Sequence, residues 1–224
     1  QQRVAVSRLI ALQSTILLMD EPLSNLDAKL RTEMRTELKR LHRELEATTV
    51  YVTHDQTEAL TLSDIVVVMD RGLVMQWGTP YEIYHHPKNL FVAEFIGDQR
   101  VNCFKGTISH QNGQVTLDCG KLILPLNQDL PSNSGKVVAT VRPESIEVSI
   151  QEKKGWLKVN LSSVQPTGAN TILQGSLEEN EITLLQPGFI RKGIDEPIWI
   201  NFNADSLNYF DEETERNLII RSTV

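Results

Sequence analysis

The feature that most constrains the fold is an apolar run of strand length that ends in two adjacent carboxylates and a proline. It lies in the stretch from Thr15 to Asp27, TILLMDEPLSNLD. Near-continuous apolar character over this length is typical of a buried strand that emerges at its carboxyl end. Ligands of open parallel sheets bind just beyond those ends, so Asp20 and Glu21 stand where a site is expected.

Two neighbouring acids at such an edge suit a hard cation and an attacking water. We expect Asp20 to hold Mg²⁺, directly or through water, and Glu21 to orient or deprotonate the water. A strand that simply runs into an acidic, solvated turn would show the same two residues. The pair by itself therefore leaves both interpretations open.

A second apolar strand, residues 49–53, leads to His54. The residues between the two strands, 27–47, carry leucine and methionine at helical spacing, which predicts an amphipathic helix that packs on the core. For His54 the alternatives are an ordinary surface or capping histidine, and an imidazole that contacts the γ-phosphate and the attacking water.

The order of these motifs resembles that of ABC-type ATPases. ILLMDEP resembles their Walker B strand, SNLD (Ser24 to Asp27) their D-loop, and VTHDQTEAL their switch-histidine loop. The resemblance implies that Glu21 and His54 are catalytic, that His54, Ser24 and Asp27 contact the nucleotide or the opposing subunit, and that Asp20 binds the metal. The implied fold is an α/β P-loop NTPase with a RecA-like core, represented here by its C-terminal part.

The first residues, QQRVAVSRL, read as a helix interior without a start signal. In the ABC family such a segment directly follows the LSGGQ signature. The 224 residues contain no G-x-x-x-x-G-K-[ST] phosphate loop. We therefore expect the chain to begin just past the signature and not to hydrolyse ATP by itself.

The hydrophobic pattern changes after Gly97, where the helical period gives way to short runs separated by Gly, Asn, Pro and Asp. Such runs predict a small β-barrel or sandwich, and Asn112-Gly113 is a tight-hairpin signature. VRPE (Val141 to Glu144) and YFDEET (Tyr209 to Thr214) resemble the TOBE-type, OB-like tail of importer ATPases. We expect residues 1–97 to be the end of the nucleotide-binding domain and residues 98–224 a regulatory, dimerising all-β domain. The expected strands of this second part are residues 103–109, 114–117, 121–124, 136–141, 146–150, 156–164, 171–174, 181–185, 197–202 and 217–220.

The charge balance limits the partners. Residues 1–97 carry 10 basic and 13 acidic side chains, and residues 98–224 carry 12 and 16. Both parts are acidic, which argues against a nucleic-acid or anionic-lipid surface. No apolar run approaches the ~20 residues that a membrane-spanning helix needs. The two cysteines, Cys103 and Cys119, fit a reduced cytosolic setting, and whether they pair stays open.

The resemblance implies an ATP-hydrolysing subunit of an ABC importer of the carbohydrate-uptake, maltose or glycerol-phosphate type. Its cofactors would be ATP and Mg²⁺. Its partners would be a second copy, a transmembrane permease and, indirectly, a solute-binding protein, and it would lie in the cytoplasm on the inner face of the membrane.

The transported solute stays open. GDQRVNCFKG (Gly97 to Gly106) is similar to the link of carbohydrate importers and favours a sugar or a glycerol-phosphate-like solute. Polyamine, ferric-ion, sulfate and molybdate importers share the architecture. Two other functions also remain: a soluble ABC-type ATPase of DNA repair or translation, and a regulatory or interaction module that acts through the β tail.

Overall fold

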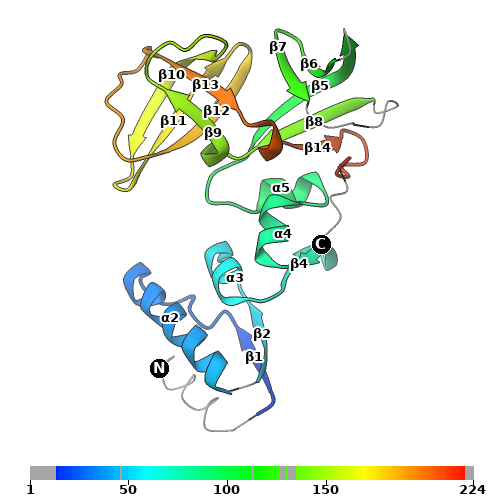
Figure 1. The fold of residues 1–224 in the computed structure, drawn as a ribbon. Coiled ribbons are helices and arrows are strands. Elements are labelled where there is room, and N and C mark those ends of the chain that lie inside the picture. Colours follow the sequence, from blue (N-terminus) through cyan, green and yellow to red (C-terminus); the bar gives the residue numbers. More distant parts are fainter. Residues whose placement is uncertain (1–13, 46, 112–113, 127–129, 131–134, 220–224) are drawn as a thin grey trace. The chain divides into compact units, whose positions relative to one another are not determined.

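The structure, a computed structural model, describes residues 14–45, 47–111, 114–126, 130 and 135–219 (Figure 1). The predicted helix over residues 2–12 and the predicted turn at residues 112–113 lie outside the described residues. The chain divides into two compact units, Gln1–Ile83 and Tyr84–Val224, and each is described by itself.

The first unit is built on two parallel strands. Strand β1 (Ile16–Asp20) pairs with β2 (Thr48–Val52), with Asp20 opposite Val52. Because the pairing is parallel, both carboxyl ends lie at the same edge. The two predicted strands are confirmed, and the crossover that parallel strands require contains helix α2 (Ala28–Leu45).

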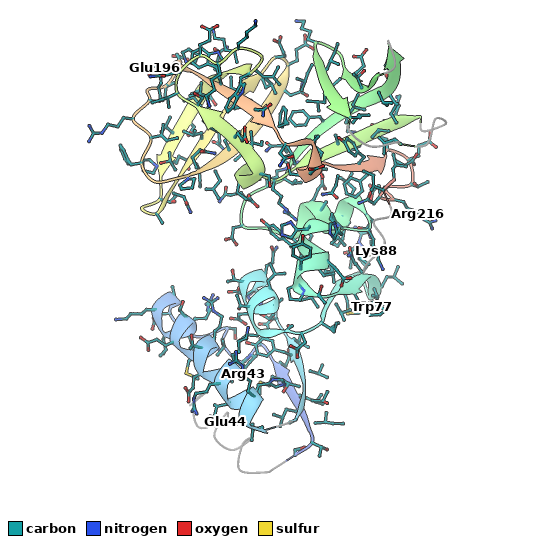
Figure 2. The ribbon with its side chains drawn as sticks, in the orientation of Figure 1. Arg43, Glu44, Trp77, Lys88, Glu196 and Arg216 are labelled. Carbon is teal, nitrogen blue, oxygen red and sulfur yellow. The ribbon has the colours of Figure 1, made fainter. Side chains whose placement is uncertain are left out.

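Helix α2 packs its apolar side on one face of this pair. Met34 and Leu38 are buried there, and Met19 and Tyr51 from the strands pack against the same cluster. The prediction that the stripe on this helix is core packing is confirmed for its central part. Arg43 and Glu44 project from the last turn of α2 into solvent (Figure 2).

Strand β1 is buried on one face, not on both as its apolar run predicts. Leu17 is 3% exposed, whereas Ile16 and Leu18 are 60% and 71% exposed. On β2, Val50 and Val52 are likewise exposed. The reason is the pleat: successive side chains point to opposite faces, and α2 covers only one of them.

The rest of the first unit follows local sequence signals. Helix α3 (Gln56–Leu62) begins after His54, and strands β3 (Val66–Asp70) and β4 (Leu73–Gly78) form a hairpin. Its two turn residues, Arg71 and Gly72, have φ of 47° and 83°, the left-handed pair that a tight hairpin turn requires.

Two short helices precede the β part. Helix α4 (Pro80–His85) starts with a capping box, in which Thr79 N–H donates to Glu82 Oε2 at 2.7 Å and Glu82 N–H donates to Thr79 Oγ1 at 3.3 Å. Helix α5 (Leu90–Phe95) starts at Asn89, whose side chain accepts from the backbone of Val92.

Two five-stranded antiparallel sheets form the β part, in the orders β12-β11-β10-β13-β9 and β14-β8-β5-β6-β7 (Figure 1). Buried residues of both sheets belong to one apolar cluster. The predicted collection of short strands around a single core is confirmed. The strands are β5 (Asn102–Gln111), β6 (Gln114–Cys119), β7 (Leu122–Leu126), β8 (Lys136–Val141), β9 (Ile146–Ser149), β10 (Leu157–Pro166), β11 (Asn170–Leu177), β12 (Asn180–Pro187), β13 (Pro197–Phe202) and β14 (Asn208–Asp211).

One strand prediction is wrong. Residues 217–219 are not in a strand, and the last strand among the described residues is Asn208–Asp211, which pairs with β8; residue 220 lies outside the described residues. Asn217 forms an isolated bridge with Phe210, and its side chain donates to the carbonyl of Pro87 at 2.7 Å. Asn217 therefore connects this segment to the residues between the two short helices. Lys88 and Arg216 mark these two segments in Figure 2.

A buried arginine explains why the second unit begins before α5. Arg142 donates to the carbonyls of Ile96 and Tyr84, and its guanidinium lies 4.2 Å from the centroid of the Tyr84 ring. The Tyr84 hydroxyl in turn donates to Glu144. Val138 and Phe210 of the sheet pack with Ala93 of α5. The second compact unit thus begins at Tyr84, whereas the sequence predicts the start of the second domain at residue 98.

No helix among the described residues is long and apolar enough to cross a bilayer. The two cysteines are both free thiols in the described structure. Burial raises the pKa of Cys103 to about 12 and that of Cys119 to about 11, so both thiols stay protonated at neutral pH.

A glycine substitution tests the sheet packing. A Cβ at Gly106 would collide with the backbone carbonyl of Asp118 on the neighbouring strand, so Gly106→Ala should lower the free energy of unfolding by ~1–3 kcal/mol. Gly135→Ala is the control, because no atom of the described residues lies within 4 Å of a Cβ placed there. Urea unfolding of both variants measures the difference, and equal midpoints would contradict the described strand packing.

Candidate functional site

The candidate site lies at the edge where β1 and β2 both end. Glu21, the first residue after β1, has φ of 43°, in the left-handed region that non-glycine residues rarely occupy. Its N–H donates to the carbonyl of Val52 at 2.8 Å, which extends the parallel pairing by one step. A backbone held in this conformation costs about 1–3 kcal/mol, so the surrounding structure must hold Glu21 in place.

Glu21 and His54 are in direct contact. His54 Nδ1 lies 2.8 Å from Glu21 Oε1, and the two side chains are 73% and 43% exposed. Because the carboxylate can only accept, the proton of this hydrogen bond sits on Nδ1. The hydrogen bond and the charge of Glu21 raise the pKa of His54 above its ordinary value of 6.5.

Ser24 and Asp27 shape the turn that links Glu21 to helix α2. The Ser24 hydroxyl donates to the carbonyl of Glu21 at 2.9 Å. Asp27 Oδ1 accepts from the N–H of Leu30 at 2.9 Å and so caps α2. Both residues therefore already have a role within the chain, beside any role toward a nucleotide or a second subunit.

Asp20 is exposed at the end of β1. Among the described residues, no group of three or more His, Cys, Asp and Glu side chains could hold a metal ion. Mg²⁺ is commonly bound through one or two carboxylates together with water and phosphate oxygens. A single exposed carboxylate fits such a contributing ligand, and it does not fit a metal site made by protein side chains alone.

A polar network that was not predicted from the sequence lies beside His54. Glu58 is 2% exposed and accepts from the hydroxyls of Tyr51 at 2.8 Å and Thr53 at 2.9 Å. Asp55 caps α3 by accepting from the N–H of Glu58 at 3.0 Å. The Asp-x-x-Glu spacing at the start of α3 was the available signal, because it resembles a capping box.

Arg31 of α2 joins this network. Its Nη1 donates to Asp55 Oδ2 at 3.1 Å. Burial disfavours the charged form of Asp55, but the N–H of Glu58 and the guanidinium of Arg31 outweigh that and lower its pKa. The sequence offered no signal for this pair, because Arg31 and Asp55 stand on different elements.

Comparisons with known proteins agree with the motif order. The chain is 40% identical over 215 residues to the sn-glycerol-3-phosphate import ATP-binding protein UgpC of Escherichia coli strain K12, covering 96% of this chain and 60% of that protein. UgpC 1 of Rhizobium johnstonii is 38% identical over 216 residues, covering 96% of this chain and 58% of that protein. The chain thus spans about 60% of the length of these relatives and matches their C-terminal part.

Among solved structures, the chain is similar to the cytoplasmic molybdate-binding protein ModG with molybdate bound. That similarity covers 48% of this chain and 94% of ModG, at 15% identity and a TM-score of 0.37. No protein-family model matches the chain.

The contact between Glu21 and His54 predicts a titration behaviour. Since the pKa of His54 is raised, the contact stabilises the folded chain fully below pH 6.5 and the effect is lost as the pH rises through the raised value. NMR of the labelled chain should show His54 titrating above 6.5, and Glu21→Gln should lower its pKa toward the ordinary value. An unchanged His54 pKa in Glu21→Gln would show that the contact does not persist in solution.

Proposed function

We propose that the chain is the C-terminal part of an ATP-binding subunit of an ABC importer, and that it supplies the residues for ATP hydrolysis and a regulatory tail; its 40% identity to the C-terminal part of UgpC supports this. The observation that carries the proposal is the 2.8 Å contact between Glu21 and His54 at the common end of two parallel strands. Two residues singled out from separate motifs, 33 positions apart, meet there.

The fold proposed for the first part is the end of an α/β P-loop NTPase core. Its support is the parallel β1–β2 pair with α2 on one face. The other face carries the exposed side chains of Ile16, Leu18, Val50 and Val52, an apolar surface of the kind that a larger α/β core covers on both sides. The relatives are longer than this chain, which fits such a core.

For the second part we propose an OB-like, TOBE-type regulatory domain over residues 98–224, following a nucleotide-binding part that ends at residue 97. Two antiparallel sheets around one core support an all-β domain there. In this proposal α4 and α5 belong to the nucleotide-binding part by sequence and pack on the β domain through Arg142.

The chemistry follows from what each side chain can do. Glu21 accepts a proton from the attacking water, and its hydrogen bond from His54 Nδ1 fixes the orientation of the imidazole. In the protonated imidazole, which the contact with Glu21 favours, the opposite ring nitrogen Nε2 also carries a proton and can donate it in a hydrogen bond to a phosphate oxygen. Asp20 provides a carboxylate oxygen to Mg²⁺, which when bound neutralises charge on the phosphates.

The partners and the solute follow from the relatives. We propose a homodimer in which Ser24 and Asp27 lie near the subunit interface, docked on a transmembrane permease at the cytoplasmic face of the membrane and served by a solute-binding protein. UgpC is named for sn-glycerol-3-phosphate import, which favours the glycerol-phosphate-like solute among those predicted for this protein. ATP and Mg²⁺ are the proposed cofactors.

Loss of one carboxylate tests the proposed chemistry. In the full-length gene product, Glu21→Gln should lower ATP turnover by about 10²–10⁴-fold while ATP still binds, because general-base catalysis contributes about that much. Glu33→Gln is the matched control, since Glu33 is an exposed glutamate on α2. Steady-state hydrolysis and nucleotide binding are measured together, and normal turnover by Glu21→Gln would refute the assignment.

A further inference from the structure

One guanidinium connects the two segments that carry Glu21 and His54. Arg31 Nη2 donates to the carbonyl of Leu26 at 3.1 Å, in the turn after β1. Its Nη1 donates to Asp55 Oδ2 at 3.1 Å, in the residue directly after His54. Arg31 therefore holds both segments at once from the first turns of α2.

The segment around His54 is fixed on both sides of the imidazole. Before it, the Thr53 hydroxyl donates to Glu58 Oε2 and its Oγ1 accepts from the N–H of Asp55, each at 2.9 Å. After it, Asp55 caps α3 and binds Arg31. Glu58 also lies 3.9 Å from Arg31 Nε, which is buried without a hydrogen-bond partner, so Glu58 adds charge attraction and not a third hydrogen bond.

The segment after Glu21 is a folded turn. The backbone N–H and the hydroxyl of Ser24 both donate to the carbonyl of Glu21, at 3.3 and 2.9 Å. The N–H of Leu26 donates to the carbonyl of Leu23 at 3.2 Å. These hydrogen bonds connect Leu26, which Arg31 contacts, to the backbone of Glu21 within one short turn.

We propose that Arg31 is a positioning residue that couples the turn 21–27 to the loop 53–58 and so keeps His54 within hydrogen-bond reach of Glu21. The inference rests on the proposed ATPase function for its kinetic consequence, and on geometry alone for the coupling. Arginine is suited to this role because its planar fork reaches two acceptors on different segments at the same time. A lysine ammonium at the same place would donate to one of the two acceptors, Asp55 or the Leu26 carbonyl, and leave the other without this hydrogen bond.

Three variants test the coupling. Arg31→Met removes both contacts at similar volume, Arg31→Lys retains one, and Asp55→Asn removes the charged partner while keeping a side chain that can cap α3. Arg40→Met is the matched control, because Arg40 is an exposed arginine of the same helix that pairs only with Glu37 and Glu44 in the described contacts.

The kinetic measurement is ATP hydrolysis by the full-length protein assembled with its permease. Displacing a positioned group by about 1 Å can cost up to 10²-fold in rate, so Arg31→Met should lower kcat by about 10- to 100-fold with little change in KM for ATP. Arg31→Lys should fall between Arg31→Met and the wild type. Combining Arg31→Met with Asp55→Asn should be no worse than the slower single variant, since Arg31→Met already removes the Arg31–Asp55 contact that Asp55→Asn weakens.

The second measurement needs no nucleotide. Amide hydrogen exchange of the full-length protein should speed up in residues 21–27 when Asp55→Asn is introduced in the other segment, and in both segments for Arg31→Met. Arg40→Met should leave both unchanged. If wild-type protein fails to hydrolyse ATP, the proposed function is wrong, and the exchange data alone decide the coupling. Unchanged exchange in residues 21–27 of well-folded Asp55→Asn would overturn the coupling, whatever the kinetics.

Discussion

The parallel pairing of β1 with β2 is the interaction on which the site depends. Antiparallel strands would place Glu21 and His54 at opposite ends, whereas parallel strands in register, Asp20 opposite Val52, bring both ends to one edge. The pairing continues one residue past β1 through the Glu21 N–H, which holds that residue in its unusual backbone conformation. The 2.8 Å contact with His54 is a consequence of this register.

The side chains around the edge are fixed from the helix side. Helix α2 buries Met34 and Leu38 against one face of the strands, and the same helix presents Arg31 to both loops. The apolar packing of Met34 and Leu38 and the hydrogen bonds of Arg31 thus come from adjacent turns of one helix. The side chains of His54 and Glu21 are themselves exposed, which fits the proposed contact with water and a phosphate.

Much of this arrangement could be predicted from the sequence. Helical spacing placed α2, apolar runs placed β1 and β2, and the order of the motifs identified Glu21 and His54 before any contact was known. The β part was predicted nearly strand by strand, because Gly, Asn and Pro separate the runs.

What the sequence could not predict are contacts between elements that no local pattern encodes. Arg31 reads as one more charge on the polar side of a helix, and only the fold places it between Leu26 and Asp55. Arg142 likewise gains its role from two carbonyls that are distant in sequence. The strand at Asn208–Asp211 was missed because pairing with β8, and not its own composition, makes it a strand.

The most direct test of the central claim, that Glu21 and His54 act as one unit, is a double-mutant cycle on single-turnover ATP hydrolysis by the full-length protein. Its four members are the wild type, Glu21→Gln, His54→Ala and the double variant. Residues that act as a unit give strongly non-additive losses, so the double variant should be about as slow as the slower single variant. Two losses that multiply would show that the residues act independently and would contradict the account.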